Sequence, residues 1–459
     1  MRLFSIVLLI SLLLPGCTSP PASSRGDRPN VVILFADDLG YGDLGVYGHP
    51  TIRTPNLDRM AAEGMKFTQF YVGASVCTPS RAALLTGRLP IRSGMVNDRI
   101  RVIFPPSEGG LPESEITLAE ALKTKGYATA CIGKWHLGHQ PRFLPTNQGF
   151  DQYFGLPYSN DMSPALTPGS ANRGDPPLPL LRGTETIEEE PDQRTLTRRY
   201  TEEAIQFIRD NKDRPFFLYL PHTFPHVPLF ASDAFEGKSP RGLYGDVVEE
   251  LDWSTGQILA TLRDLGLAEN TFVFFTSDNG PWLTEKLEGG SAGLLKDGKG
   301  TTWEGGMRVP AIAWWPGAIA PGKVTDALAT TMDLYATALA LAGIALPDDR
   351  VVDGVDLTPL LRGESEQVRD VVFYYRGTRL FAVRKGPWKM HFITQSAYVR
   401  DEPVPHDPPA LYHLEHDPSE RFNVAADHSD VIADIMQEVE RHRAALNPAP
   451  SQLEIPAWE

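Results

Sequence analysis

Short runs of apolar residues alternate with longer amphipathic stretches through most of this 459-residue chain. The runs are apolar at nearly every position, which is typical of strands whose two faces are both covered. Such strands, separated by helices, predict an α/β fold with a large, mostly parallel sheet between helices. The predicted strands are Val31–Phe35, Ala128–Ile132, Phe216–Leu220, Phe272–Phe275 and Ala311–Trp315. The predicted helices are Thr54–Gly64, Thr117–Gly126, Thr195–Asp210, Tyr244–Leu265 and Met332–Ala342.

The pattern changes after about residue 366, where the apolar runs become shorter and turn residues separate them. This change indicates a small antiparallel sheet. Its predicted strands are Val371–Tyr375, Leu380–Arg384, Trp388–Phe392 and Ala410–Leu414, and a helix over Asp430–Leu446 follows. We therefore expect a large N-terminal domain over residues 29–365 and a small-sheet subdomain over residues 366–459. Pro164–Pro191, rich in Pro, Gly and acidic residues, predicts a long surface loop.

Residues 1–16 have the pattern of an export signal, with Arg2 before an apolar core over Leu3–Leu14 that is too short to span a membrane. The core ends in Leu-Pro-Gly-Cys, which resembles a bacterial lipobox and predicts lipidation of Cys17. Residues 17–28 would then form a flexible tether. We expect an exported, periplasmic lipoprotein of a bacterium that touches the membrane only through this anchor. Ordinary signal cleavage nearby is the alternative.

The formal net charge of −15 argues against non-specific binding to nucleic acid. An anionic ligand would therefore need a local positive pocket. The candidates for that pocket are Arg81, Lys134, Lys299 and a metal ion.

Two cysteines remain besides Cys17, namely Cys77 and Cys131, and they could pair in an oxidising compartment. Cys131, however, lies inside an apolar run and is predicted to be a core residue.

Four of the predicted strands lead directly into polar residues. The segments that follow them are Asp37-Asp38, Gly133-Lys134-Trp135-His136, Pro221–His226 and Thr276–Gly280. In an open α/β sheet, ligands bind beyond the carboxyl ends of the strands. If the four strands are parallel neighbours, we expect these segments to meet at one edge.

The acidic members of these segments predict a metal site. Asp37, Asp38, Asp278 and Asn279 would offer only oxygen ligands, which Ca²⁺ and Mg²⁺ prefer. Adjacent carboxylates would repel one another without a cation among them. Either pair alone is more often a turn former than a ligand, but together, each after a buried strand, they favour the metal.

Basic and glycine-rich residues supply the rest of the expected site. Lys134 is a point charge for an anionic oxygen, and His136 can move protons near neutral pH. Lys299 lies in Gly298–Gly306, whose glycines let the backbone approach a ligand closely. Each of these residues alone would more often be a solvated or core group than a catalyst.

Residues 77–87 have the sequence Cys-Thr-Pro-Ser-Arg-Ala-Ala-Leu-Leu-Thr-Gly. Pro79 suits the first turn of a helix and Gly87 its end. Cys77 would then lie at the helix N-terminus, where free N–H groups and the helix dipole favour an anion. The alternative is a buried structural cysteine before an ordinary helix.

This run resembles the activation signature of the type I, formylglycine-dependent sulfatases. Further matches in the same order are Asn30–Asp43, Thr54–Asp58, Gly133–Gly138, Gly155–Ser159, Ser277–Pro281 and Gly298–Gly306. The chain is most similar to the arylsulfatase A and N-acetylgalactosamine-6-sulfatase members of that family. The resemblance covers about Pro29 to the C-terminal helix, and it implies an alkaline-phosphatase-like mixed sheet with a small C-terminal antiparallel sheet.

The resemblance also implies residue roles. A formylglycine-generating enzyme would oxidise Cys77 to Cα-formylglycine, whose hydrated aldehyde attacks sulfur. The implied ligands of Ca²⁺ (or Mg²⁺) are Asp37, Asp38, Asp278, Asn279 and residue 77. Arg81 would hold the modified residue, and His136 and Ser159 would assist there. The implied sulfate-binding residues are Lys134, His226 and Lys299, with His406 near the substrate. The match is loose over Pro221–Pro228, which leaves His222 as an alternative to His226.

The predicted function is hydrolysis of a sulfate monoester, aryl or sugar-borne, to an alcohol and inorganic sulfate. Two alternatives stay open. One is a phosphodiesterase or phosphonate monoester hydrolase of the same superfamily. The other is a lipid-tethered protein that binds sulfate without turnover and keeps an unmodified Cys77.

Overall fold

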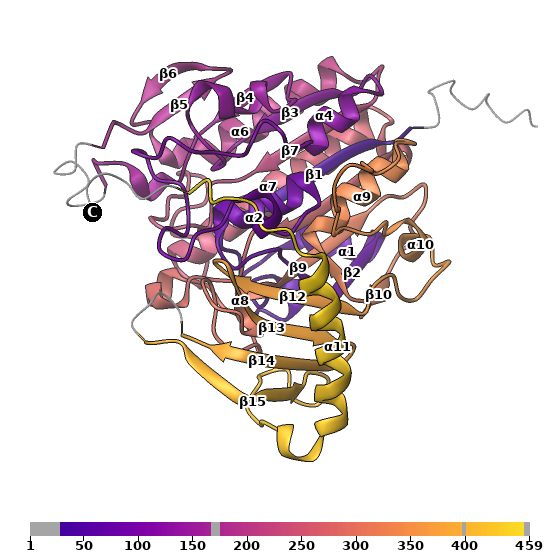
Figure 1. Ribbon diagram of the computed structural model, residues 1–459. Coiled ribbons are helices and arrows are strands. Elements are labelled where there is room, and N and C mark those ends of the chain that lie inside the picture. The colour runs from indigo at the N-terminus through magenta and orange to yellow at the C-terminus, as the bar shows by residue number, and fades with distance from the viewer. Residues whose placement is uncertain (1–27, 167–174, 397–400, 454–459) are drawn as a thin grey trace, which may run out of the picture.

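The computed structural model describes residues 28–166, 175–396 and 401–453. The predicted signal peptide, Cys17 and residues 17–27 of the tether lie outside these ranges. Figure 1 shows one large sheet wrapped by helices and a smaller sheet at one end of the molecule, with the helix α11 (Ser429–Ala445) lying across it. Within the described residues, no helix is long and apolar enough to cross a membrane.

The large sheet is mixed, and its centre is parallel. Its strands are β1 (Asn30–Ala36), β2 (Met65–Tyr71), β3 (Ala128–Ile132), β4 (Gln152–Gly155), β5 (Pro179–Arg182), β6 (Glu185–Glu189), β7 (Phe216–Pro221), β8 (Thr271–Ser277), β9 (Arg308–Trp314), β10 (Lys323–Thr325) and β11 (Ala329–Thr330). The order is β10-β2-β9-β8-β1-β7-β3-β4-β5-β6, with β11 beside β2. Strands β8, β1, β7, β3 and β4 are all parallel, whereas β9 and β5 join them antiparallel. The predicted fold class is confirmed.

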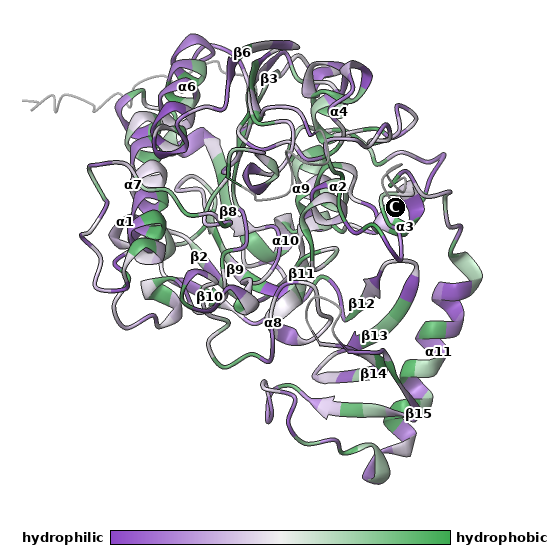
Figure 2. Cartoon of the chain, turned by 90° about the vertical axis from the view of Figure 1, so that its left-hand side faces the viewer, coloured by the Kyte–Doolittle hydropathy of each residue, from purple (hydrophilic) through white to green (hydrophobic). Residues whose placement is uncertain are grey.

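Helices cover both faces of this sheet. They are α1 (Pro55–Glu63), α2 (Cys77–Thr86), α3 (Pro90–Ser93), α4 (Leu118–Lys123), α6 (Leu196–Asp210), α7 (Leu243–Asp264), α8 (Glu304–Met307), α9 (Thr331–Leu341) and α10 (Thr358–Leu361). Val31, Ile33 and Phe35 pack with the core that α2, α4 and α9 contribute to, and the alternate residues of β1 pack with α1, α6 and α7. Figure 2 shows these two helical layers on opposite sides of the sheet. This burial explains why β1 is apolar throughout.

The small sheet has the order β12 (Val371–Arg376), β13 (Arg379–Lys385), β14 (Trp388–Thr394) and β15 (Val404–His413), all antiparallel. Val383, Met390 and Leu411 pack against Ile435 and Val439 of α11. The predicted antiparallel sheet and terminal helix are both present. Strand β15 begins earlier than predicted and contains prolines, which an edge strand tolerates because its outer N–H groups need no partner.

The prediction of one long loop over Pro164–Pro191 is wrong in part. Its second half forms the hairpin of β5 and β6, which extends the sheet edge beyond β4. Residues Glu185–Glu189 are exposed or half-buried and carry no apolar pattern, so main-chain pairing rather than side-chain burial makes this strand. Strand β2 also escaped prediction, because polar residues interrupt its apolar positions.

A buried ionic cluster joins the two sheets. Lys389 of β14 donates to Glu304 Oε1 at 2.9 Å and lies 3.1 Å from Glu420 Oε1, and all three side chains are fully buried. Tyr71, at the end of β2, donates to Glu304 Oε2 at 2.6 Å. Glu304 lies in Gly298–Gly306, the segment that carries Lys299. The cluster therefore links the small sheet to that segment.

We expect Lys389→Met to lower the free energy of unfolding by about 3–5 kcal/mol, because it leaves two buried carboxylates without their shared cation. Lys385→Met is the matched control. Lys385 also forms ion pairs, but with the half-exposed Asp434 and Glu438 at the surface, where an ion pair contributes about 0–1 kcal/mol. Urea unfolding of both variants measures the difference, and equal losses would contradict the structural role of the cluster.

Candidate active site

The carboxyl ends of the central strands converge, and the polar segments continue their hydrogen-bond ladder. Strand β1 lies between β7 and β8, with Phe35 opposite Pro221 and Ala36 opposite Ser277. Beyond the strands, Asp278 N donates to Ala36 O at 3.1 Å and Lys134 N donates to Pro221 O at 2.7 Å. The register therefore brings the segments after β1, β3, β7 and β8 to one edge, as the sequence predicted.

Gly133 allows the end of β3 to approach β7 this closely. Its backbone has φ = 130°, and a Cβ at this position would lie 1.9 Å from Pro221 O. Only glycine avoids both the backbone strain and the overlap. The close approach sets Lys134, the next residue, against the strand ends.

Cys77 is the first residue of α2, and the whole helix is buried. Val76 precedes it in an extended conformation, and Gly87 ends the helix in the left-handed region (φ 68°). The predicted helix and both of its ends are confirmed. The thiol lies 3.5 Å from Asp37 Oδ1 and 3.8 Å from Lys134 Nζ.

Three buried carboxylates and three buried cations form the centre of the site. Lys134 Nζ lies 2.5 Å from Asp37 Oδ2, and Lys299 Nζ lies 2.7 Å from Asp38 Oδ2. The Arg81 guanidinium donates two hydrogen bonds to Asp278 Oδ2, at 2.8 and 3.1 Å. All six side chains are at most 3% exposed. Each of the three cations therefore lies against one of the carboxylates.

The carboxylates differ in their proton affinity. Burial raises the pKa of Asp38, although Lys299 opposes it. Burial and the negative charge of Asp37 raise the pKa of Asp278 to about 7. At Asp37 burial also acts to raise the pKa, but Lys134 and Arg81 outweigh it and hold the pKa well below its usual range. A cation placed among these groups would favour the ionised form of all three.

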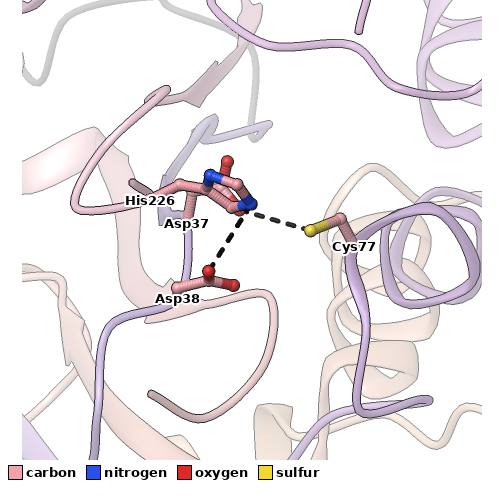
Figure 3. Close-up of side chains that lie close together, drawn as sticks. All are labelled: Asp37, Asp38, Cys77 and His226. Carbon is pink, nitrogen blue, oxygen red and sulfur yellow. Dashed lines mark hydrogen bonds and ion pairs between the residues drawn. The ribbon is translucent and has the colours of Figure 1, made fainter. Parts of the chain in front are cut away.

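The cluster fits a divalent cation. Asp37, Asp38, Cys77 and His226 each offer a ligand atom, and these atoms lie within 4.8 Å of one another (Figure 3). Asn279 Nδ2 donates to Asp38 Oδ1 at 2.7 Å, while its Oδ1 is buried without a hydrogen-bond partner. A buried amide oxygen without a partner is costly unless something binds it. Carboxylate and amide oxygens are the ligands that Ca²⁺ and Mg²⁺ prefer.

Asp278 lies beside that group of four rather than within it. Its Oδ1 accepts from Asp38 N at 3.1 Å, and its Oδ2 is held by Arg81. Arg81 also lies 3.4 Å from Asp37 Oδ1 and donates to Lys134 O at 2.8 Å. Arg81 therefore connects three of the converging segments.

His136 and Ser159 lie next to this centre. Lys134 Nζ donates to Ser159 Oγ at 3.0 Å, and Thr78 Oγ1 donates to His136 O at 3.0 Å. His136 Nε2 lies 2.9 Å from Ile103 O, and because a carbonyl can only accept, this nitrogen carries the proton. Its buried Nδ1, which has no hydrogen-bond partner among the described residues, is then the proton-accepting atom. Burial and the charge of Lys134 lower the pKa of His136, so the ring is neutral.

The structure brings His226, rather than His222, to the carboxylates. His226 Nε2 lies 3.6 Å from Asp38 Oδ2, while its Nδ1 lies 2.6 Å from Val227 O. His222 is buried as well, and burial lowers its pKa to about 3. Its backbone N–H continues the ladder to Phe35 O at 2.8 Å.

His406 lies on β15, where its Nε2 is 2.9 Å from Thr394 Oγ1. Among the described residues, no hydrogen bond or ion pair joins it to the carboxylate cluster.

Trp282 was not predicted from the sequence, and it lies at the site. The centroid of its ring is 4.3 Å from Lys299 Nζ and 5.2 Å from the centroid of the His226 ring. Its position directly after the polar segment Thr276–Gly280 and Pro281 is the signal that could have identified it. Cys77 and Cys131 are both buried free thiols.

Two family models match the chain. The model described as Sulfatase matches residues 29–344, and the model of the C-terminal region of aryl-sulfatase matches residues 367–458. Human arylsulfatase A (Homo sapiens) is 45% identical over 464 residues, which cover 93% of this chain and 90% of that protein. N-acetylgalactosamine-6-sulfatase from Canis lupus familiaris is 44% identical over 485 residues, which cover 97% and 91%.

A solved structure extends the similarity to the fold. The PsFucS1 sulfatase from Pseudoalteromonas sp. superposes with a TM-score of 0.84 at 32% identity and covers 93% of each chain. The Sulfatase model spans the converging strand ends and the Cys77 helix. The chain therefore belongs to the sulfatase family, whose members hydrolyse sulfate esters.

Proposed function

We propose that this sulfatase hydrolyses sulfate monoesters, either aryl sulfates or sulfated sugars and glycolipids, through a formylglycine made from Cys77. The observation that carries the proposal is the position of Cys77. It begins a fully buried helix and lies between the carboxylate of Asp37 and the ammonium of Lys134. A nucleophile made at this position would lie beside both the candidate metal ligands and the basic residues.

The ligand atoms of the site support a divalent cation there, because Asp37 and Asp38 are adjacent buried carboxylates beside the buried amide oxygen of Asn279. Lys134 and Lys299 lie against the same two carboxylates. When bound, the cation would supply positive charge that offsets the carboxylates and the transferring sulfuryl group. Its proposed ligands are the oxygens of Asp37, Asp38, Asp278 and Asn279, together with residue 77. Lys134, Lys299 and His226 would then be available to hold the sulfate oxygens.

The modified residue and its neighbours have separate roles in the proposal. Formylglycine would supply a hydrated aldehyde with two hydroxyls on one carbon. One hydroxyl would form the bond to sulfur as the alcohol leaves, and loss of a proton from the other would re-form the aldehyde and expel sulfate. Arg81 would orient this residue, and Ser159 would hold the Lys134 ammonium in place. His136 would accept a proton at Nδ1, because its Nε2–H is already donated to Ile103 O. His406 is proposed only as a residue near the leaving alcohol.

Several parts of the proposal rest on the sequence. These are the identity of the cation as Ca²⁺ or Mg²⁺, the maturation enzyme that oxidises Cys77, and export with lipidation at Cys17. The division into a catalytic domain over residues 29–365 and a subdomain over residues 366–459 is also proposed.

A phosphodiesterase or phosphonate monoester hydrolase activity is the second candidate function, since the cluster would stabilise a phosphoryl group by the same charges.

Substrate preference tests the proposal directly. We expect kcat/KM for 4-nitrophenyl sulfate to exceed that for bis(4-nitrophenyl) phosphate, measured on protein co-expressed with a formylglycine-generating enzyme. Mass spectrometry of the peptide containing residue 77 should show oxygen in place of sulfur and the loss of two hydrogens. A preference for the phosphodiester, or turnover by protein that keeps an intact thiol, would contradict the proposal.

Cys77→Ser is the matched control for the modification. A serine offers one hydroxyl on its carbon, so its sulfated form has no second hydroxyl to expel sulfate. We expect at most one equivalent of 4-nitrophenol per enzyme from this variant, measured in a burst experiment. Continued turnover would show that the second hydroxyl is not needed.

The two histidines after β7 can be separated by substitution. We expect His226→Ala to lower kcat/KM for 4-nitrophenyl sulfate by about 10²-fold or more, because it removes the imidazole whose Nε2 faces the charged centre. His222→Ala should have a much smaller effect, since within the described residues no hydrogen bond or ion pair joins its side chain to the carboxylates. Melting temperatures of both variants control for the lost packing. A larger loss in His222→Ala would reverse the assignment.

A further inference from the structure

Trp282 lies at the reaction centre, and the chemistry proposed above gives it no role. The centroid of its ring is 4.3 Å from Lys299 Nζ and 5.2 Å from the centroid of the His226 ring, and the rings of Trp282 and His226 are inclined at 60°. Lys299 and His226 are each 3% exposed, whereas Trp282 is half-buried. The indole therefore packs against two of the proposed sulfate-binding residues and also reaches solvent.

Main-chain hydrogen bonds hold the segment that leads into Trp282 against the segment that carries Lys299. Lys299 N donates to Pro281 O at 2.9 Å, and Gly280 N donates to Gly306 O at 3.1 Å. Two backbone contacts thus set the position of the indole beside the Lys299 ammonium, in addition to the packing of the ring itself. A side chain held on a fixed backbone in this way can select among ligands by shape.

A sulfate ester bound at this centre would bring its alcohol part to the indole. An oxygen that accepts a hydrogen bond from Lys299 Nζ lies about 2.9 Å from that atom, and the centroid of the indole lies 4.3 Å from the same atom. The alcohol part is joined to the same sulfur atom as that oxygen. It therefore lies within contact distance of the indole as it extends from the buried centre toward solvent.

The chemistry of the indole indicates which alcohols it favours. Its face is broad, apolar and uncharged, and aromatic side chains gain about 0.5–1.5 kcal/mol from stacking beyond the area that they bury. An aryl ring can stack on such a face, and a sugar ring can lay its C–H face against it. A small alkyl group offers much less contact area.

We propose that Trp282 is a specificity-determining residue, which contacts the leaving group of the sulfate ester and favours a leaving group that carries a ring. This inference rests on the proposed function, because the same centre must hold the sulfate, and it adds a class of substrate to that function. The alternative is that Trp282 acts only through Lys299, whose ammonium lies within cation–π range of the ring. A contact with the leaving group affects only esters that carry a ring, whereas an effect through Lys299 reaches every sulfate ester.

The test compares the binding of sulfate monoesters of equal charge to the full-length Cys77→Ala protein, which lacks the proposed nucleophile, in Ca²⁺ buffer. Methyl sulfate has no ring, 4-nitrophenyl sulfate has an aryl ring, and N-acetylgalactosamine 6-sulfate has a sugar ring. By calorimetry, we expect the added substitution Trp282→Leu to weaken the binding of a ring ester by at least about fivefold. The binding of methyl sulfate should change by less than about twofold. A loss with 4-nitrophenyl sulfate alone would assign an aryl leaving group, and a loss with the sugar ester would assign a sugar.

Two further variants control for the loss of the ring. Trp282→Phe keeps an aromatic face and should retain most of the affinity for the ring esters. Trp388→Leu is the matched control, because Trp388 is also half-buried and packs on two imidazoles, with ring centroids 4.5 Å from His413 and 4.7 Å from His428. It should leave the affinity for all three esters unchanged. Melting temperatures of the three variants control for folding.

An equal loss of affinity for methyl sulfate in Trp282→Leu would show that the ring acts through Lys299 and would overturn the proposed contact. Unchanged binding of both ring esters, or no binding of either to the parent protein, would overturn it as well. Turnover of 4-nitrophenyl sulfate by the mature enzyme is measured separately. Its absence would overturn the proposed function and leave the affinities to decide the role of Trp282.

Discussion

The crowding of Asp37, Asp38 and Asp278 at the end of β1 and β8 is the constraint on which the rest of the site depends. Three buried carboxylates repel one another, and each would be costly to keep ionised without a cation. The chain places Lys134, Lys299 and Arg81 against them, from three different segments. The same cations are what a sulfate ester needs.

Backbone geometry makes this crowding possible. The parallel pairing of β1 with β7 and β8 fixes which residues leave the sheet side by side. Glycine at position 133 lets β3 approach β7, and the buried helix α2 presents Cys77 to Asp37. The cluster of Lys389, Glu304 and Glu420 then fixes the small sheet against the segment that carries Lys299. The position of Lys299 at the reaction centre thus depends on the contact between the two sheets.

Much of this arrangement could be predicted from the sequence, because the central strands are apolar on both faces and end in chemically distinctive residues. The convergence of Asp37, Lys134, His226 and Asp278 follows once those strands are taken as parallel neighbours. The hairpin of β5 and β6 could not be predicted, since exposed polar strands leave no apolar pattern. Trp282 was missed for a different reason. It follows the polar segment after β8 directly, but its contacts are with Lys299 and His226, which come from other segments and meet it only in three dimensions.

Cation binding by the carboxylate cluster is what the proposed chemistry of the site most depends on. A crystal structure of the mature protein grown with Ca²⁺, with an anomalous difference map, tests whether the cluster holds a cation. We predict an anomalous peak bonded to oxygens of Asp37, Asp38 and Asn279. Absence of a peak from this cluster, at a Ca²⁺ concentration that supports turnover, would show that these residues do not hold the cation.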